Sequence, residues 1–470
     1  MGETEIVSGK LPLTQKTGYG SIEFSNAIMF TAFMTFGLFF FTDIVGLSPS
    51  FAGAILAIVT LWDAITDPLL GVISDKSKNK YGRRRPFLLG VAIPFGIVCW
   101  LLFTNWGFGE VGTKVYFILI VILYYTAMTV LDVPYTALGA EMTPDYDERT
   151  SLNTWRALFC QVGTIFGGAL PIAVAAKLGD MTGSISTGWS YTGLFIGVLA
   201  SAIILFGWRM TRGGELFPED THVNFRDIFT GPFRNKPFLF VIGFYSVGIM
   251  SIALAASFFV YYLKDFMMYD EEAISLAMAI MFVPTVLWVP LVDFVSKRYS
   301  KRVSWVFFSS VSLIATICLY LFVQPKNDIT LYIFMVMASS IMLIPYQVGW
   351  SIIPDCIEVD EYKTGARREG LYYGIVTFIQ KGGSALILWI GGILLEMSGY
   401  NAELAVQAPE TKEGIRAILF GGQSMLLVIG IVLVLLFPLT REKHRAILKA
   451  VKARKEGKVI DESSFKDCVS

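Results

Sequence analysis

The chain has 470 residues, of which 54% are hydrophobic and only 16% are charged, with 38 basic and 38 acidic side chains. Its mean hydropathy is +0.60. An ordinary soluble protein does not need so much apolar surface, so this composition excludes a soluble domain and indicates a membrane protein.

Apolar stretches long enough to cross a bilayer as helices recur along the whole chain. They lie at residues 21–45, 50–74, 86–104, 114–140, 151–176, 189–209, 235–263, 272–296, 303–323, 329–354, 371–396 and 416–438. They predict an all-α membrane protein with twelve transmembrane helices.

The connecting loops differ in charge, and this difference predicts the orientation. The loop 75–86 carries six basic residues and the loop 297–302 carries four, whereas the alternate loops near 44–50, 105–113, 264–271 and 324–328 hold at most one each. Basic loops stay in the cytoplasm. We therefore expect a protein of the plasma membrane, with both termini in the cytoplasm. The expected membrane is a bacterial inner membrane.

A polar segment divides the chain into halves. We expect an N-terminal six-helix bundle at 1–209, a cytoplasmic middle loop at 210–234, a C-terminal six-helix bundle at 235–440 and a cytoplasmic tail at 441–470. The sequence after Pro68 faintly repeats after Pro290, each time before a basic loop. In an architecture of two such pseudo-symmetric six-helix bundles the substrate sits at the midplane between them, and rocking of the halves gives alternating access.

The second apolar stretch contains two carboxylates, Asp63 and Asp67. A carboxylate at membrane depth costs several kcal/mol, on the order of 3 by insertion scales, so its presence indicates a function. Residues four apart share one face of a helix, and paired carboxylates suit a hard monovalent cation such as Na⁺, or a proton. The alternative is a pair that only stabilises the helix.

The fourth stretch adds Thr129 and Asp132, which are three apart and share a helix face. A hydroxyl and a carboxylate there would complete an oxygen cage with Asp63 and Asp67. A polar group satisfied at a bend before Pro134 is the alternative reading of Asp132.

Two cations within apolar stretches could balance these acids. Lys381, beside Gly382 and Gly383, cannot easily extend to either membrane surface, so we expect it to face a central cavity. Arg156 lies nearer a cytoplasmic end, where a headgroup contact is the alternative. Tyr135 and Thr377 complete the candidate substrate contacts, although lipid or helix packing explains many membrane aromatics.

The first basic loop is a candidate gate. Gly71 and Gly82 would permit close helix approach and a tight turn, and Asp75 could pair with Arg83 or Arg84. A loop that only anchors the topology is equally consistent. A second charged cluster, beginning at Asp355 and Glu358, predicts a salt-bridged cytoplasmic helix, and the basic tail predicts contact with inner-leaflet lipid.

At these residues the chain resembles the glycoside–pentoside–hexuronide:cation symporter family, a branch of the major facilitator superfamily that includes melibiose permease. The shared motifs cover nearly the whole chain, and the most specific are Trp62–Pro68, Asp132–Tyr135, Glu141–Thr143, Asp147–Arg149 and Lys363–Gly370 leading to Lys381–Gly383. The resemblance implies a coupling-cation site at Asp63, Asp67 and Thr129. It also implies sugar contacts at Asp132 and Arg156, and a cavity lysine at Lys381.

Two positions depart from melibiose permease. Its sugar-binding aspartate of the first span aligns with Ala27, where only Glu23 and Asn26 are near, and a tryptophan in its fourth span aligns with Thr136. These departures leave the cation half of the site better supported than the sugar half.

Together these observations predict a monomeric secondary active symporter, not an enzyme, that takes up a sugar, glycoside or hexuronide with Na⁺, H⁺ or Li⁺. Its partners would be the small substrate, the cation and membrane lipid, with no cofactor and no nucleic acid. The alternatives are a carrier of lysolipids or organic anions, or a non-transporting receptor with the same fold.

Overall fold

The structure is a computed structural model of the chain. It describes residues 10–77, 79, 81–143, 145–213, 232–325, 327–364, 369–455, 465 and 468. The described residues divide into two compact helical units, the first within Met1–Asp220 and Tyr269–Ala279 and the second within Thr221–Met268 and Ile280–Ser470. The predicted all-α class is confirmed.

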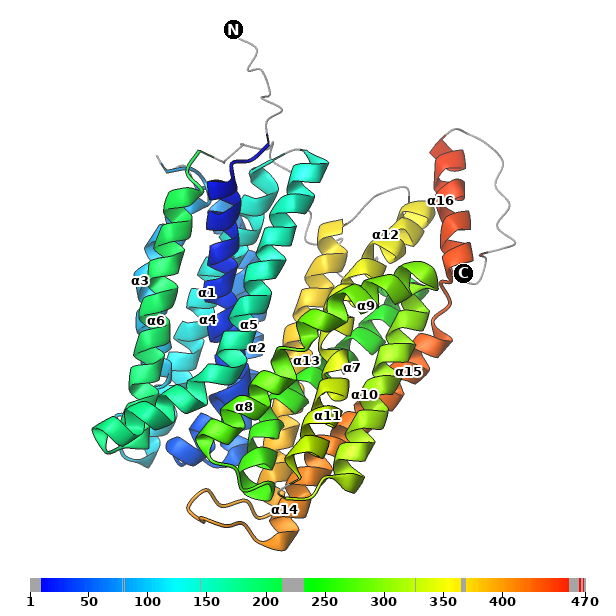
Figure 1. Cartoon of the computed structure of the whole chain (residues 1–470). Helices are drawn as coiled ribbons and strands as arrows, with labels where there is room; N and C mark the ends of the chain where they lie inside the picture. Colours follow the sequence, from blue (N-terminus) through cyan, green and yellow to red (C-terminus); the bar gives the residue numbers. More distant parts are fainter. Residues whose placement is uncertain are drawn as a thin grey trace. The chain divides into compact units, whose positions relative to one another are not determined.

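The first unit is a bundle of long helices (Figure 1). Its elements are α1 (Leu13–Phe39), the π-helical turn η1 (Phe40–Ile44), α2 (Pro49–Asp75), α3 (Arg85–Leu102), α4 (Glu110–Glu141), α5 (Tyr146–Thr182) and α6 (Ile185–Met210). The stretch Tyr269–Ala279 also belongs to this unit. Within it, the Ser275 hydroxyl donates a hydrogen bond to the Ala169 carbonyl at 2.8 Å.

The second unit contains more, and shorter, helical segments. They are η3 (Pro232–Arg234), α7 (Lys236–Tyr261), η4 (Tyr262–Phe266), α8 (Glu271–Phe282), α9 (Thr285–Arg298), α10 (Lys301–Phe322), α11 (Asp328–Ala338), η5 (Ser339–Leu343), η6 (Pro345–Gly349), α12 (Trp350–Thr364), α13 (Glu369–Met397), α14 (Pro409–Arg416), η7 (Ala417–Gly421), α15 (Gly422–Leu436) and α16 (Arg441–Lys455), with the start of α8 falling in the first unit.

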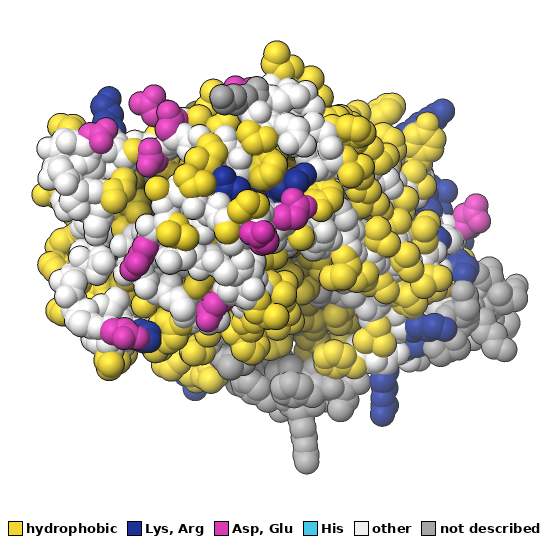
Figure 2. Space-filling view, turned by 90° about the horizontal axis from the view of Figure 1, so that it is seen from below, with side chains coloured by type: hydrophobic (Ala, Val, Ile, Leu, Met, Phe, Trp, Pro, Cys, Tyr) yellow, Lys and Arg dark blue, Asp and Glu magenta, His cyan; other side chains and the backbone are white. Residues whose placement is uncertain are grey.

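Eleven helical segments among the described residues are long and apolar enough to cross a membrane. The described apolar part of α2, Pro49–Val59, is shorter and takes the place of the second expected span. Side chains on the outer faces are apolar, for example Phe195 and Leu287, which are 60% and 73% exposed. On the face shown in Figure 2, which is seen from below, hydrophobic side chains cover large areas, with acidic and basic side chains scattered among them.

Two expected spans are interrupted by proline. The predicted helix 272–296 is divided into α8 and α9 around Pro284, and the predicted helix 329–354 contains the π-helical turn η6, which begins at Pro345. Proline lacks the N–H that continues a helix and collides with the preceding turn, so the hydrogen-bond pattern changes there. The sequence reasoning treated both stretches as single helices.

Close contact between α1 and α5 positions the candidate site of the first unit. A Cβ atom on Gly163 would lie 2.8 Å from the carbonyl oxygen of Phe24, and one on Gly20 would lie 3.1 Å from that of Trp155. Both backbones approach this closely because glycine has no side chain. Polar groups on the two helices can therefore meet.

We expect Gly163→Ala to destabilise the protein by about 1–3 kcal/mol, because the added methyl group forces α1 and α5 apart. Gly90→Ala is the matched control, since a Cβ at Gly90 meets no atom within 4 Å; it should be neutral or stabilise by up to about 1 kcal/mol through helix propensity. Thermal unfolding in detergent measures both. Equal melting temperatures for the two variants would contradict the packing described here.

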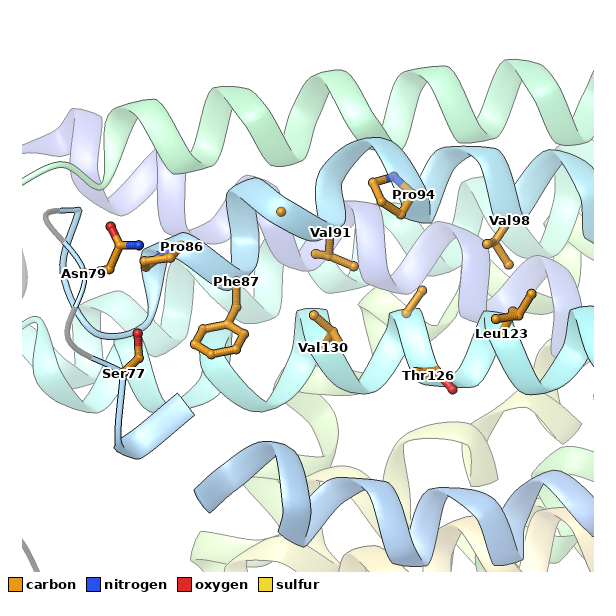
Figure 3. Close-up of a pocket in the computed structure, with 12 residues that line it drawn as sticks. Ser77, Asn79, Pro86, Phe87, Val91, Pro94, Val98, Leu123, Thr126 and Val130 are labelled. Atoms are coloured by element: carbon orange, nitrogen blue, oxygen red, sulfur yellow. The ribbon is translucent and has the colours of Figure 1, made fainter. Parts of the chain in front are cut away.

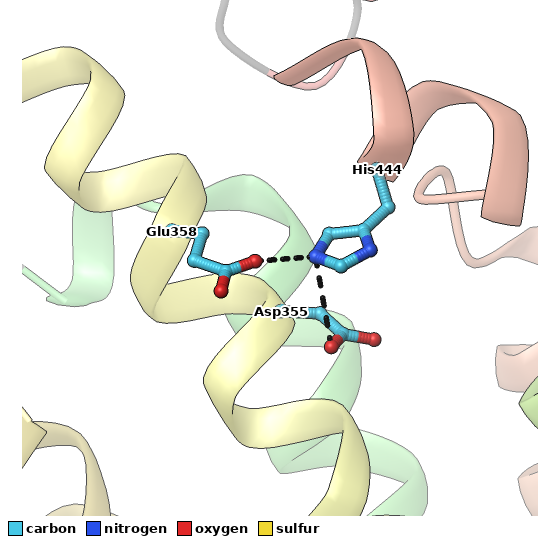
Figure 4. Close-up of side chains that lie close together, drawn as sticks. All are labelled: Asp355, Glu358 and His444. Carbon is cyan, nitrogen blue, oxygen red and sulfur yellow. Dashed lines mark hydrogen bonds and ion pairs between the residues drawn. The ribbon is translucent and has the colours of Figure 1, made fainter. Parts of the chain in front are cut away.

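A cluster of charged side chains joins α16 to α12 (Figure 4). The Nε2 atom of His444 lies 2.5 Å from Glu358 and 3.7 Å from Asp355. Lys301 at the start of α10 contacts Asp355 at 2.7 Å, so its ammonium supplies the positive charge that a metal ion would otherwise bring. The charged segment that sequence reasoning placed after the tenth span is therefore salt-bridged, and it continues the helix of that span.

The hydrogen bond to Glu358, aided by the charges of Asp355 and Glu358 and opposed by burial and Lys301, raises the pKa of His444 above its ordinary value of 6.5. Protonated His444 stabilises the packing of α16 against α12. This stabilisation is fully present when the pH is below the ordinary pKa of histidine, and it is lost as the pH rises through the raised pKa of His444. We expect amide hydrogen exchange in α16 to accelerate across that window, after correction for the intrinsic rate.

His444→Gln should remove this pH dependence. His222→Gln is the control, because His222 is the other histidine of the chain and lies outside the described residues. A pH dependence of α16 protection that survives in His444→Gln would show that another group attaches the helix.

Candidate cation and substrate site

Two carboxylates of α2 meet one hydroxyl of α4. The Oγ1 atom of Thr129 lies 3.0 Å from Oδ1 of Asp63 and 3.0 Å from Oδ1 of Asp67. The two carboxylate oxygens are thus no farther apart than twice that distance. Asp63 is 2% exposed and Asp67 is half-buried. The structure brings together three of the four residues that the sequence analysis grouped as a cation cage, and the fourth, Asp132, is hydrogen-bonded to Asn26.

The chemistry of this group favours a bound positive charge. The threonine hydroxyl has one hydrogen, so it can donate to only one of the two carboxylates at a time. Two carboxylates this close repel each other, and a cation or a proton between them offsets that repulsion. Three oxygen atoms of this kind are ligands that a hard monovalent cation accepts.

Asp132 lies one turn farther along α4 and connects to α1. Its Oδ1 atom accepts a hydrogen bond from the Asn26 side-chain amide at 3.3 Å. Its backbone carbonyl accepts a hydrogen bond from the Thr136 hydroxyl. The sequence analysis placed Asp132 in the cation cage. Its side-chain contact with Asn26 also connects it to α1.

Arg156 of α5 is paired with Glu23 of α1. The Nε atom of Arg156 lies 2.7 Å from Oε2 of Glu23, whose side chain is only 8% exposed. The guanidinium also lies over the ring of Tyr135, 5.5 Å from its centre. Arg156 therefore faces the interior of the first unit next to α1 and α4, rather than the surface that a headgroup would occupy.

Tyr135 is fully buried and holds α4 against α1. Its ring stacks on Tyr19 with 4.5 Å between the centroids, and its hydroxyl donates to the Tyr19 carbonyl at 3.1 Å. Because it is at 0% exposure, Tyr135 acts through the position of its neighbours. The sequence analysis listed it as a substrate contact without this packing role.

Sequence reasoning missed the pairing of Glu23 and the contact of Asn26. It counted three acids against two bases around the site. Within the first unit, the structure adds a fourth acid, Glu23, directly on Arg156. The only signal in the sequence was that Glu23 and Asn26 lie in the first apolar stretch, close to Ala27.

Lys381 and Thr377 belong to the second unit and lie one turn apart on α13, both half-buried. Their neighbour Gln380 accepts a hydrogen bond from the Tyr245 hydroxyl at 2.6 Å, and that hydroxyl accepts one from the Trp350 indole at 3.1 Å. This polar chain places α13 beside α7 and α12. The role of Lys381 and Thr377 in substrate binding remains a prediction.

The candidate gate residues are fixed by a partner that was not predicted. Arg84 contacts Glu141 at the end of α4 at 2.9 Å and donates to the Ser74 hydroxyl at 2.6 Å, and Arg83 lies 3.7 Å from Glu141. The side chain of Asp75, expected in that role, lies outside the described residues.

The two glycines of the loop behave differently. Gly82 has φ +100°, and its N–H donates to the Asn79 carbonyl at 3.0 Å, so a tight turn requires glycine there. A Cβ at Gly71 would meet no atom within 4 Å, so the expected close helix approach does not occur at Gly71 in the described structure.

A separate apolar groove of about 540 Å³ lies between α3 and α4 (Figure 3). Its lining includes Phe87, Val91, Pro94, Leu123 and Val130. Among the described residues that line it, none belongs to the acidic group of α2 or to the Arg156 pair. It is a hydrophobic surface suited to acyl chains, and the polar chemistry lies elsewhere.

The described helices form two units, and the first unit contains buried carboxylates. A helical membrane protein of this kind has the architecture of a major facilitator transporter. The protein belongs to the family described as MFS/sugar transport protein, whose model matches residues 18–441. The resemblance noted in the sequence is thereby confirmed, and the family is one of transporters rather than enzymes.

Characterised and putative relatives cover nearly the full chain. A putative glycoside/cation symporter of Escherichia coli is 28% identical over 93% of this chain and 94% of its own length. A glucuronide carrier protein homolog of the same organism is 26% identical, over 93% and 95%. The crystal structure of a D-xylose–proton symporter matches with a TM-score of 0.60 at 14% identity over 90% of this chain and 96% of its own, which shows the fold. Symporter relatives imply a coupling cation.

We expect Thr129→Val to weaken binding of the coupling cation about tenfold to a hundredfold, because a hydrogen bond or ligand to charged groups contributes on the order of 1.5–3 kcal/mol. The measurement is a thermal-shift titration with NaCl against choline chloride at constant ionic strength, repeated over a pH series to detect a proton instead.

Thr126→Val is the matched control. Thr126 lies one turn earlier on the same helix and accepts a hydrogen bond from the Trp62 indole at 2.8 Å, outside the carboxylate pair. The control should bind the cation as the wild type does. Wild-type affinity in Thr129→Val would exclude the hydroxyl from the site.

Proposed function

We propose that the protein is a secondary active symporter that takes up a sugar or glycoside together with Na⁺ or H⁺. The observation that carries the proposal is the hydroxyl of Thr129 within 3.0 Å of both Asp63 and Asp67, in a chain whose relatives are symporters. Buried carboxylates that share one donor create a demand for a positive charge, and a coupling ion meets it.

Binding of the cation prepares the substrate position on the next turn of α4. Thr129 and Asp132 lie on one face of that helix, so a cation at Thr129 offsets negative charge close to Asp132. With less repulsion there, Asp132 and Asn26 can bind the hydroxyl groups of a sugar. Because such coupling is reciprocal, the sugar also tightens cation binding.

Alternating access completes the proposed cycle. The two helical units would rock about a site at the midplane, exposing it to each side in turn. The basic loop 75–86 supports an orientation with both termini in the cytoplasm of a bacterial inner membrane. In that orientation the ion pairs of Arg83 and Arg84 with Glu141 lie on the cytoplasmic side, where a gate is needed.

A carrier of lysolipids or organic anions is the second candidate within transporters. The apolar groove between α3 and α4 could accept an acyl chain. The lining of this groove does not include the acidic group of α2. Coupling would therefore take place at the polar site, which favours a polar substrate. A receptor that does not transport would have no use for the carboxylate pair of α2.

We expect Asp63→Asn and Asp67→Asn each to lower cation-stimulated sugar uptake in proteoliposomes at least about tenfold, because each removes a charge that the cation requires. Asp180→Asn is the control, since Asp180 is exposed near the end of α5. Each variant is checked for membrane insertion and a monodisperse elution profile. Unchanged cation stimulation in both α2 variants would refute ion coupling through this pair.

A further inference from the structure

The arginine of the candidate substrate site is already neutralised within its own unit. Glu23 of α1 contacts Arg156 at 2.7 Å, with side-chain exposures of 8% and 31%. The pair is kept in place by the close approach of α1 and α5 at Gly20 and Gly163. An arginine with no such partner would offer its whole planar fork to a substrate carboxylate.

A substrate carboxylate would have to compete with Glu23 for this guanidinium. If it displaced Glu23, it would leave a buried carboxylate without its cation, which is strongly unfavourable. If it did not displace Glu23, two carboxylates would crowd one arginine, and their repulsion would oppose binding. Both outcomes disfavour an acidic substrate.

The other charged groups of the site in the first unit act in the same direction. Asp132 accepts a hydrogen bond from Asn26. Asp63 and Asp67 contact Thr129, which lies one turn from Asp132 on α4. One cation bound at the α2 pair does not outweigh four carboxylates and one arginine. Carboxylates do, however, accept hydrogen bonds from the hydroxyl groups of an uncharged sugar.

We propose that Glu23 is a specificity-determining residue, which restricts the site to uncharged sugars and glycosides by occupying Arg156 and so rejecting uronates and other anions. The proposal rests on the proposed function and names its substrate class. The relatives include a putative glycoside symporter and a glucuronide carrier homolog. Of these two substrate classes, the proposal assigns the uncharged glycosides to this protein. Rejection through like charge is a common device of specificity.

The test uses matched pairs of ligands that differ only in a carboxylate. The purified full-length chain is titrated with methyl β-D-glucoside and methyl β-D-glucuronide, and with methyl β-D-galactoside and methyl β-D-galacturonide, each in NaCl and in choline chloride. Thermal shift and competition against a bound glycoside give the relative affinities. We expect the wild type to favour the uncharged member of a pair at least about tenfold.

Glu23→Gln should reverse or abolish this preference, because it frees Arg156 for a carboxylate. Glu148→Gln is the matched control: Glu148 forms the other described ion pair between these two helices, with Lys16 at 2.8 Å, but at the start of α5. It should lower stability comparably and leave the preference unchanged. If Glu23→Gln does not fold, Glu23→Asp is measured instead; its shorter side chain loosens the contact with Arg156 and should narrow the preference. A preference that is unchanged in a folded Glu23 variant overturns the role of Glu23.

The outcomes separate this inference from the proposed function. Equal or tighter binding of uronates by the wild type overturns the role of Glu23 and leaves ion coupling intact. Sugar binding that does not depend on cation or pH overturns the coupling and leaves the neutral preference intact. A response to lysophosphatidylcholine alone, tested in the same assay, overturns both.

Discussion

The cost of placing carboxylates among apolar helices is the constraint on which the site depends. Each acid of the candidate site has a specific neighbour: Thr129 for Asp63 and Asp67, Asn26 for Asp132, and Arg156 for Glu23. A hydroxyl and an amide offset less of that cost than a guanidinium does. The hydroxyl shared by Asp63 and Asp67 suits this pair to a transient positive charge, whereas Glu23 has the permanent charge of Arg156.

This division gives the first unit two kinds of electrostatic site on neighbouring helices. In the proposed function the α2–α4 contact is responsive, because an ion bound there would change its charge balance. The α1–α5 contact is fixed, because its two opposite charges lie 2.7 Å apart and compensate each other. α4 connects the two, since Thr129 belongs to the first and Tyr135 packs against α1 beside the second. Ion binding can thus alter the environment of Asp132 without disturbing the framework that presents it.

The sequence was sufficient for features that are local or compositional. Asp63 and Asp67 share a helix face by their spacing alone, and Thr129 precedes Asp132 by one turn for the same reason. The pairing of Glu23 with Arg156 could not be found in this way, because 133 positions separate them and their meeting depends on how closely α1 crosses α5. Similarly, Glu141 meets Arg84 across 57 positions. Helix interruptions at Pro284 and Pro345 follow from proline chemistry, yet proline within α4 and α5 leaves those helices continuous, so the residue type alone did not decide them.

The two ion pairs between α1 and α5 have opposite polarity. Near the helix starts a lysine of α1 meets a glutamate of α5, and two turns farther a glutamate of α1 meets an arginine of α5. A relative displacement of two turns would bring Lys16 toward Arg156 or Glu23 toward Glu148, and like charges would oppose it. The pattern acts as an electrostatic register that permits a single alignment of the two helices. In the proposed transport cycle the two ion pairs therefore favour movement of α1 and α5 together over a slide of one helix along the other.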